Sequence, residues 1–254
     1  MSDAPINHVP LNRAIADFAL LTYENQETFN HRTGAGAFQL DLMTSQLELG
    51  GQVFRVAFLG TWSEITRTWM WGWANPSRQE TDPVVVPVVK GLRDRARELG
   101  LQELEVPTFP TEGINDLDWH PAMGLVTVAT SLLGGQAFHA ASYDGGCAFV
   151  AVLDAPPAQA DPVKLMRFSA MAWEAAATSP TAGQDGVRHR HALDTYARWR
   201  GLRAEHAQSA MRMHYPHGSL AEITFDELGR AVNTEISMRP GDVPEPLPFT
   251  PPAE

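Results

Sequence analysis

Three tryptophans occupy every second position in the middle of the chain, at Trp69, Trp71 and Trp73. Side chains alternate between the two faces of a β-strand, so this spacing predicts three indoles in a row on one side of a sheet. Such a row is either the thickest part of a hydrophobic core or the floor of a groove that stacks sugars, bases or a partner's side chains. Trp119 lies in an acidic, aromatic loop that could form the rim of such a groove. The candidate ligand-binding residues are therefore Trp69, Trp71, Trp73 and Trp119.

Five of the nine histidines fall in a short C-terminal stretch. They are His189, His191, His206, His214 and His217. Zinc sites commonly combine two or three histidines with a carboxylate, and Asp194, Glu205 or Glu222 could supply the carboxylate here. The spacing matches neither a helical i, i+4 pair nor a known zinc motif. These histidines therefore either bind a metal ion or are ordinary surface residues near flexible loops.

No other motif in the chain indicates a reaction. There is no Walker loop, no Gly-x-Ser-x-Gly, no His-Glu-x-x-His and no dinucleotide fingerprint, which removes the most common enzyme classes. The leading interpretation is a non-catalytic ligand- or protein-binding module without a cofactor. The alternative is a metal-dependent hydrolase that uses the histidine-rich segment.

The charge of the chain restricts its partners. The 254 residues carry a formal net charge of −11, with a pI near 5.2. An acidic surface repels phosphate backbones and anionic lipids, so neither nucleic acid nor a membrane is an expected partner. The expected partner is therefore an unidentified small molecule or protein. The segment 162–238 could also pair in a homodimer.

The cysteine and apolar content predict a cytoplasmic protein. Cys147 is the only cysteine, so no intrachain disulfide can form, as is usual in a reducing compartment. The N-terminus lacks the pattern of a signal peptide, and no run of 18 apolar residues could span a membrane. The basic residues are 17 Arg against 2 Lys, which indicates a GC-rich bacterial genome.

The elements that would position these residues are helices packed on an antiparallel sheet. Helical periodicity covers residues 10–30, 83–99, 121–133 and 162–177, whereas residues 38–74 alternate as a meander of three or four strands. Asp144-Gly145-Gly146 predicts a hairpin over 137–153. The fold class is therefore α+β, an antiparallel sheet meander with helices packed on it.

Changes in composition suggest three segments. Residues 1–178 read as the main α+β domain, and a loop rich in Gly, Ser and Thr follows. Residues 179–239 read as a C-terminal helix plus a hairpin, packed on the main domain. Residues 240–254 contain six prolines and are expected to form an extended or disordered tail.

One string of residues also resembles a known family. Leu59-Gly-Thr-Trp62, followed by Thr68-Trp-Met-Trp-Gly-Trp-Ala-Asn-Pro76, is similar to an uncharacterised bacterial family, a domain of unknown function, whose members carry alternating tryptophans ending in Trp-Ala-Asn. The resemblance covers residues 10–155, with Gly72 where alanine is more usual. It supports the expected fold and implies no activity.

Overall fold

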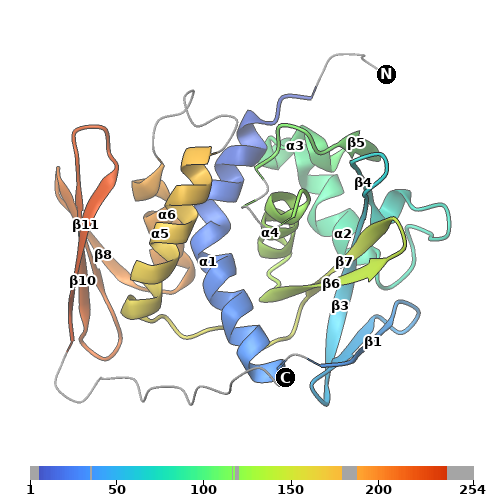
Figure 1. The fold of residues 1–254 in the computed structure, drawn as a ribbon, viewed down its shortest axis with the longest axis horizontal. Coiled ribbons are helices and arrows are strands. Elements are labelled where there is room, and N and C mark those ends of the chain that lie inside the picture. The colour runs from blue at the N-terminus through green and yellow to red at the C-terminus, as the bar shows by residue number, and fades with distance from the viewer. Residues whose placement is uncertain (1–5, 35, 116, 118–119, 179–187, 239–254) are drawn as a thin grey trace.

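The structure, a computed structural model, describes residues 6–34, 36–115, 117, 120–178 and 188–238. It contains two antiparallel β-sheets with helices between them (Figure 1). This arrangement confirms the expected α+β class and the antiparallel meander.

The larger sheet has seven strands and the smaller sheet has four. The larger sheet consists of β1 (Phe38–Asp41), β2 (Gln46–Leu49), β3 (Gln52–Ser63), β4 (Thr68–Trp71), β5 (Thr108–Pro110), β6 (Ala137–Tyr143) and β7 (Gly146–Val152). The smaller sheet consists of β8 (Arg203–His206), β9 (Ala210–His214), β10 (Leu220–Phe225) and β11 (Ala231–Ser237). The order is β1-β2-β3-β4-β5 with β7 on β3 and β6 on β7 in the first sheet, and β11-β10-β9-β8 in the second.

The strand β3 organises the larger sheet. Its first residues pair with β2 and its later residues pair with both β4 and β7. Gly50 and Gly51 connect β2 to β3, and both have positive φ angles, of 57° and 71°. Glycine adopts such angles without steric cost, so the chain can reverse in a tight hairpin as predicted.

The helices are α1 (Val9–Thr33), α2 (Val86–Gly91), α3 (Ala96–Leu99), α4 (Met123–Leu132), α5 (Pro162–Thr178) and α6 (His189–Trp199). Helix α1 runs through the middle of the molecule and contacts α4, α5 and α6 (Figure 1). Because other helices cover several sides of α1, some of its polar residues are buried as well as its apolar ones. None of the described helices is long and apolar enough to cross a membrane.

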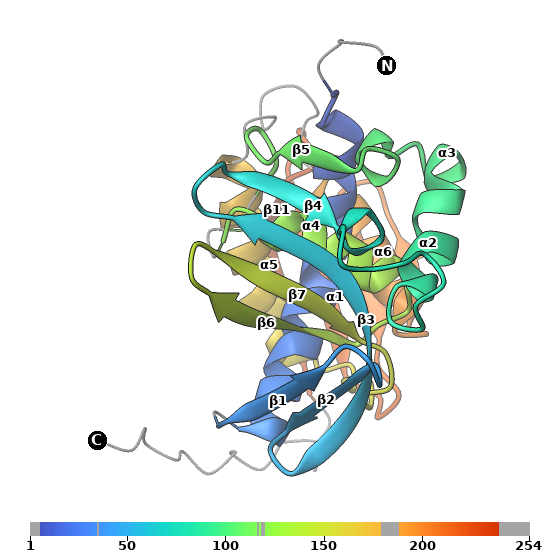
Figure 2. The ribbon, with the colours of Figure 1, turned by 90° about the vertical axis from the view of Figure 1, so that its right-hand side faces the viewer.

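The central strands carry buried side chains on both faces. Figure 2 views the larger sheet from its outer side, with α1 and α4 behind it. Towards α1 and α4, β3 and β7 present Ala57, Leu59, Phe149 and Ala151. On the other face, a second cluster includes Val56, Phe58, Val150 and Val152, packed against Val84, Val85 and Val89. The apolar run of β3 is thus explained by burial on two sides.

Two features differ from the sequence-based expectations. The helix expected over 83–99 is interrupted, because α2 ends at Gly91 and a 3-10 turn over Arg93–Arg95 precedes α3. Glycine favours such a break, and the end of α4 packs directly against Gly91 through Leu133. The C-terminal part contains β8 and β9 in addition to the expected helix and hairpin, because strands of four and five residues leave little periodicity to detect.

The proposed boundary at 178/179 adjoins residues 179–187, which lie outside the described residues, as does the tail 240–254. One cluster of buried side chains extends from Leu11 in α1 to Phe225 in β10. The two segments therefore share a hydrophobic core.

Candidate functional site

Two of the three alternating tryptophans belong to the core. Trp69 and Trp71 lie on β4 and have no exposed surface. Their rings meet edge to face with centroids 5.3 Å apart, and Trp71 Nε1 donates a hydrogen bond of 2.8 Å to the Glu103 carbonyl oxygen. In this conformation the two indoles offer no surface to a ligand, so they form part of the hydrophobic core and not the floor of a groove.

Trp73 does not continue the row, and the expectation that it extends the strand is wrong. β4 ends at Trp71, and Gly72–Ala74 form a 3-10 turn that moves Trp73 to a partly buried position under the Arg93 guanidinium. The turn requires glycine, since a Cβ at Gly72 would lie 2.8 Å from Phe58 Cδ1 and closer still to the Phe58 carbonyl oxygen. Trp119 lies outside the described residues.

The five C-terminal histidines occupy separate environments. His191 pairs with Asp17 at 2.8 Å, His206 with Asp194 at 3.3 Å, and His214 with Glu205 at 3.2 Å, while His217 is exposed. Among the described residues there is no group of three or more His, Cys, Asp or Glu side chains that could hold a metal ion. Their placement therefore gives no support to the metal-dependent alternative.

His189 is a structural residue by its contacts. Its ring stacks on Trp173 with centroids 4.3 Å apart, and its Nδ1 accepts a hydrogen bond of 3.0 Å from the Ala231 backbone N–H. Burial lowers the pKa of His189 to about 4, because the charged imidazolium would lose its hydration. A neutral imidazole thus joins α5, α6 and β11.

A surface groove lies where β2, β3 and the end of β7 meet the segment that leads into α2. Its volume is about 470 Å³, within the range of small-molecule sites. The lining residues are Thr44, Ser45, Gln46, Val53, Phe54, Arg55, Val56, Pro83, Pro87, Leu153 and Asp154. We call this feature the β2–β3 groove.

The β2–β3 groove contains two oppositely charged side chains that are not paired with each other. Asp154 Oδ1 accepts a hydrogen bond of 2.8 Å from the Arg55 backbone N–H, which continues the β3–β7 ladder beyond Val152. Within the described parts of the chain, neither the Arg55 guanidinium nor Asp154 Oδ2 has a hydrogen bond or an ion pair. Both groups are available to a ligand.

Ser45 forms part of the same groove in a strained conformation. Its φ of 58° lies in the left-handed region, which costs a residue other than glycine on the order of 1 kcal/mol. Its carbonyl oxygen accepts a hydrogen bond of 2.9 Å from the Val56 N–H, and its buried hydroxyl has no partner. Strain of this kind is common beside binding sites.

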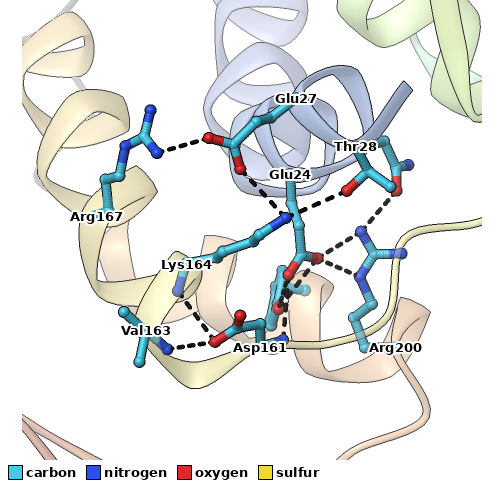
Figure 3. Close-up of polar contacts among 10 residues, drawn as sticks. Glu24, Glu27, Thr28, Asp161, Val163, Lys164, Arg167 and Arg200 are labelled. Atoms are coloured by element: carbon cyan, nitrogen blue, oxygen red, sulfur yellow. Dashed lines mark hydrogen bonds and ion pairs between the residues drawn. The ribbon is translucent and has the colours of Figure 1, made fainter. Parts of the chain in front are cut away.

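A second polar feature is a cluster of charged and polar side chains around Glu24 of α1, shown in Figure 3. Glu24 is 1% exposed, and its carboxylate accepts hydrogen bonds from Arg200 Nε at 2.7 Å and from the Tyr196 hydroxyl at 3.1 Å. The Asp161 N–H donates a third hydrogen bond, of 3.2 Å. The Arg200 side chain is itself only 7% exposed, so this is a buried ion pair between α1 and the C-terminal part.

Burial dominates the ionisation of this cluster. It raises the pKa of Glu24, although the Arg200 charge and the hydrogen bonds oppose the change. Burial and the Glu24 charge raise the pKa of Tyr196, and the same causes raise the pKa of Tyr215 nearby. The two phenols stay protonated at neutral pH, and Tyr196 acts as a donor.

Further ion pairs continue along α1 on both sides of Glu24. Glu27 pairs with Lys164 at 3.2 Å and with Arg167 at 2.6 Å, as Figure 3 shows. About two turns towards the N-terminus, Asp17 pairs with Arg188 at 2.9 Å. These contacts fasten the C-terminal part to α1, and nothing in them resembles a catalytic arrangement.

The comparisons with known proteins bear on the first part of the chain. Residues 12–156 match a family of unknown function, and this span covers more than half of the chain, including the β2–β3 groove. No curated protein and no solved structure matches the chain. The matched span agrees with residues 10–155, over which the sequence resembles a domain of unknown function, whereas α5, α6 and the smaller sheet lie beyond it. The chain therefore belongs to the family of unknown function DUF6882.

Proposed function

We propose that this protein is a non-catalytic binding module whose ligand occupies the β2–β3 groove. The observation that carries the proposal is the presence of the unpaired Arg55 guanidinium and Asp154 carboxylate in one groove of about 470 Å³. Unused charges on a rigid sheet can orient a ligand without rearrangement. The groove lining contains no His, Cys or Lys, and the buried Ser45 hydroxyl has no hydrogen-bond partner in the described chain that could act as its base, which favours binding over catalysis.

The lining suggests the chemistry of the ligand. Arg55 would take an acidic group, since guanidinium matches a carboxylate in a bidentate hydrogen bond. Asp154 would take an ammonium group or N–H donors, and Pro83, Pro87 and Val53 provide apolar contact for the rest of the molecule. A free amino acid or a short peptide carries both of these groups.

Thermal unfolding of the full chain with the free amino acids and a set of dipeptides tests the proposal. A ligand at a hundredfold excess over its Kd stabilises the native state by about 2.7 kcal/mol, which is roughly 5–10 °C in Tm for a chain of this size. Arg55→Gln should weaken that binding about 10- to 100-fold, because it removes a hydrogen bond from a charged donor.

The matched control is Arg97→Gln, since the Arg97 side chain is 92% exposed and does not line the groove. This variant should bind as the natural protein does. A panel in which no probe changes the Tm, or in which Arg55→Gln responds like the control, would contradict the proposal.

We also place the protein in the bacterial cytoplasm. The support is the excess of arginine over lysine and the single cysteine, Cys147, which is free and buried.

A further inference from the structure

Strand β3 loses its neighbour on one side where β7 ends. The β3–β7 ladder stops at the pair Val56 and Val152. The Leu153 N–H then donates a hydrogen bond of 2.9 Å to the Arg55 carbonyl oxygen, but the Arg55 N–H donates to Asp154 Oδ1. A side-chain oxygen thus takes the place of the carbonyl oxygen that a continuing β7 would supply, because the two strands separate at this point.

Val53 is the next residue of β3 that faces this side. Backbone N–H and C=O groups point alternately to the two sides of a strand. The Val56 N–H donates to the Ser45 carbonyl oxygen next to β2, whereas the Arg55 N–H points towards the end of β7. Val53 has the same orientation as Arg55, so its N–H and C=O also point away from β2. Neither group has a hydrogen-bond partner in the part of the chain that the structure covers, and the residue is 60% exposed.

The chain after β7 leaves the position beside Val53 open. By the register of the ladder, residue 155 would face Val53 if β7 continued. Ala155 is instead packed in the second hydrophobic cluster with 5% exposure, and Pro156 follows, which has no N–H for a ladder. Val53, Arg55 and Asp154 all line the β2–β3 groove. A ligand in the groove can therefore reach two free backbone groups as well as the two charges.

We propose that the β2–β3 groove binds the N-terminal end of an extended peptide, which adds to β3 where β7 stops. This inference rests on the function proposed above and restricts its ligand to a peptide with a free N-terminus. The peptide runs in the direction of β7, antiparallel to β3, so its N-terminus is the end next to Asp154. Strand addition at an exposed edge is a recurring mode of peptide recognition, in which main-chain hydrogen bonds supply affinity and side-chain contacts supply specificity.

The register of the peptide follows from Asp154. Its Oδ1 stands where the carbonyl oxygen of residue 153 would accept from Arg55, so an ammonium group beside it takes the position of the next backbone nitrogen along β7. Asp154 Oδ2, which has no hydrogen bond from any residue that the structure describes, accepts from this ammonium group. The second residue of the peptide then lies opposite Val53 and exchanges two hydrogen bonds with its N–H and C=O.

Arg55 determines the side chain at this second position of the peptide. Arg55 and Val53 are two residues apart on β3, so their side chains lie on one face, and the residue opposite Val53 shares that face. Diagonal neighbours across two paired strands are about 7–8 Å apart, within reach of long side chains. The Arg55 guanidinium thus selects a glutamate or an aspartate at the second position, with which it forms a bidentate hydrogen bond.

Isothermal titration calorimetry of the full chain with matched tripeptides tests the proposal. Ala-Glu-Ala should bind, and N-acetylation should weaken its binding about 10- to 100-fold, because the ammonium group is lost. Ala-Gln-Ala, which lacks the acidic group, and free glutamate, which lacks the main-chain pairing, should each bind about tenfold or more weakly. An ester oxygen in place of the glutamyl N–H should weaken binding about 3- to 10-fold, since it removes one neutral hydrogen bond.

Protein variants assign each effect to its residue. Val53→Pro removes the N–H on the open side of the strand, where proline is tolerated, and should weaken Ala-Glu-Ala about 3- to 10-fold. Val53→Ala keeps the N–H and is the matched control. Asp154→Asn should remove most of the difference between the free and the acetylated tripeptide, and Arg55→Gln most of the difference between glutamate and glutamine. The ester probe tests the same main-chain contact on the natural protein, without any effect on folding.

The outcomes distinguish this inference from the proposed function. If no tripeptide and no amino acid binds, both are overturned. If a ligand binds and Arg55→Gln weakens it, but acetylation, the ester and Val53→Pro have no effect, the binding function stands and the added peptide strand is excluded. Free glutamate that binds as tightly as Ala-Glu-Ala would likewise overturn this inference alone.

Discussion

Replacement of Arg200 by methionine tests how the two parts of the molecule are held together. The methionine retains most of the apolar stem but removes the guanidinium, so the Glu24 carboxylate stays buried with the Tyr196 hydroxyl and one backbone N–H. A carboxylate left without its counter-charge in such a position typically costs about 3–5 kcal/mol. We expect the free energy of unfolding to fall by that amount near neutral pH.

The loss should depend on pH, and its sign follows from the pKa of Glu24. Burial raises this pKa above the ordinary value of 4.5, and Arg200 opposes the rise, so removal of Arg200 raises it further. An acid with a raised pKa in the native state binds its proton more tightly there than in the unfolded state. The contribution of Glu24 to the free energy of unfolding is therefore greatest below the pKa of the unfolded state. It falls as the pH increases towards the pKa of the folded state. The variant should lose less stability at about pH 5 than at about pH 8, by about 1.4 kcal/mol for each unit by which the pKa rises.

Urea unfolding at both pH values measures these differences, with two further variants for comparison. Glu24→Gln combined with Arg200→Met removes both charges and should recover part of the loss, since no charge remains buried. Arg212→Met breaks the exposed Arg212–Glu222 pair and should cost less than about 1 kcal/mol. If Arg200→Met costs no more than Arg212→Met, or costs the same at both pH values, the reasoning about burial is wrong.

Two other substitutions probe positions where the structure differs from a simple pattern. Gly72→Ala should lower the free energy of unfolding by about 1–3 kcal/mol, because the added Cβ would overlap the Phe58 backbone; urea unfolding measures this, and a loss within error would contradict the close approach. The native state favours the neutral form of His189, whose pKa is lowered from 6.5 to about 4. The natural protein should therefore lose stability as the pH falls through this interval. We expect a loss on the order of 1 kcal/mol, because the ring is partly exposed and solvent reduces the effect. His189→Phe keeps the stack on Trp173 without titrating, so its unfolding free energy should vary less over this interval; an unchanged pH slope would assign the effect to other groups.

The parts of the fold that the sequence predicts well depend on local signals. Helical periodicity located α1, and the glycine turns located the hairpins β2–β3 and β6–β7, because neighbouring residues alone determine these elements. The tryptophan spacing was informative for Trp69 and Trp71 but not for Trp73. At that point the close approach of Gly72 to Phe58 turns the chain, and a contact with another strand is invisible in local spacing.

The candidate sites could not be predicted because their residues are far apart in the sequence. The β2–β3 groove brings together Ser45, Arg55, Pro83 and Asp154, each an ordinary surface residue by type. Its one local signal is the Asp-Ala-Pro-Pro stretch after β7, which ends the strand without revealing what its aspartate contacts. A glutamate on a helix is usually exposed, and the partner of Glu24, Arg200, is 176 residues away in the sequence.

The family match ends at residue 156, but the folding unit does not end there. Tyr23 stacks on Phe168 of α5 with ring centroids 6.0 Å apart, and one residue further along α1 the Glu24 carboxylate depends on Arg200 and Tyr196. A domain that stopped at residue 156 would expose the ring of Tyr23 and return the carboxylate to water, which removes the reason for its burial. The face of α1 that carries these two residues therefore makes sense only together with a covering segment. A version of this domain without α5 and α6 would need either other residues at positions 23 and 24 or a partner that supplies an equivalent cover.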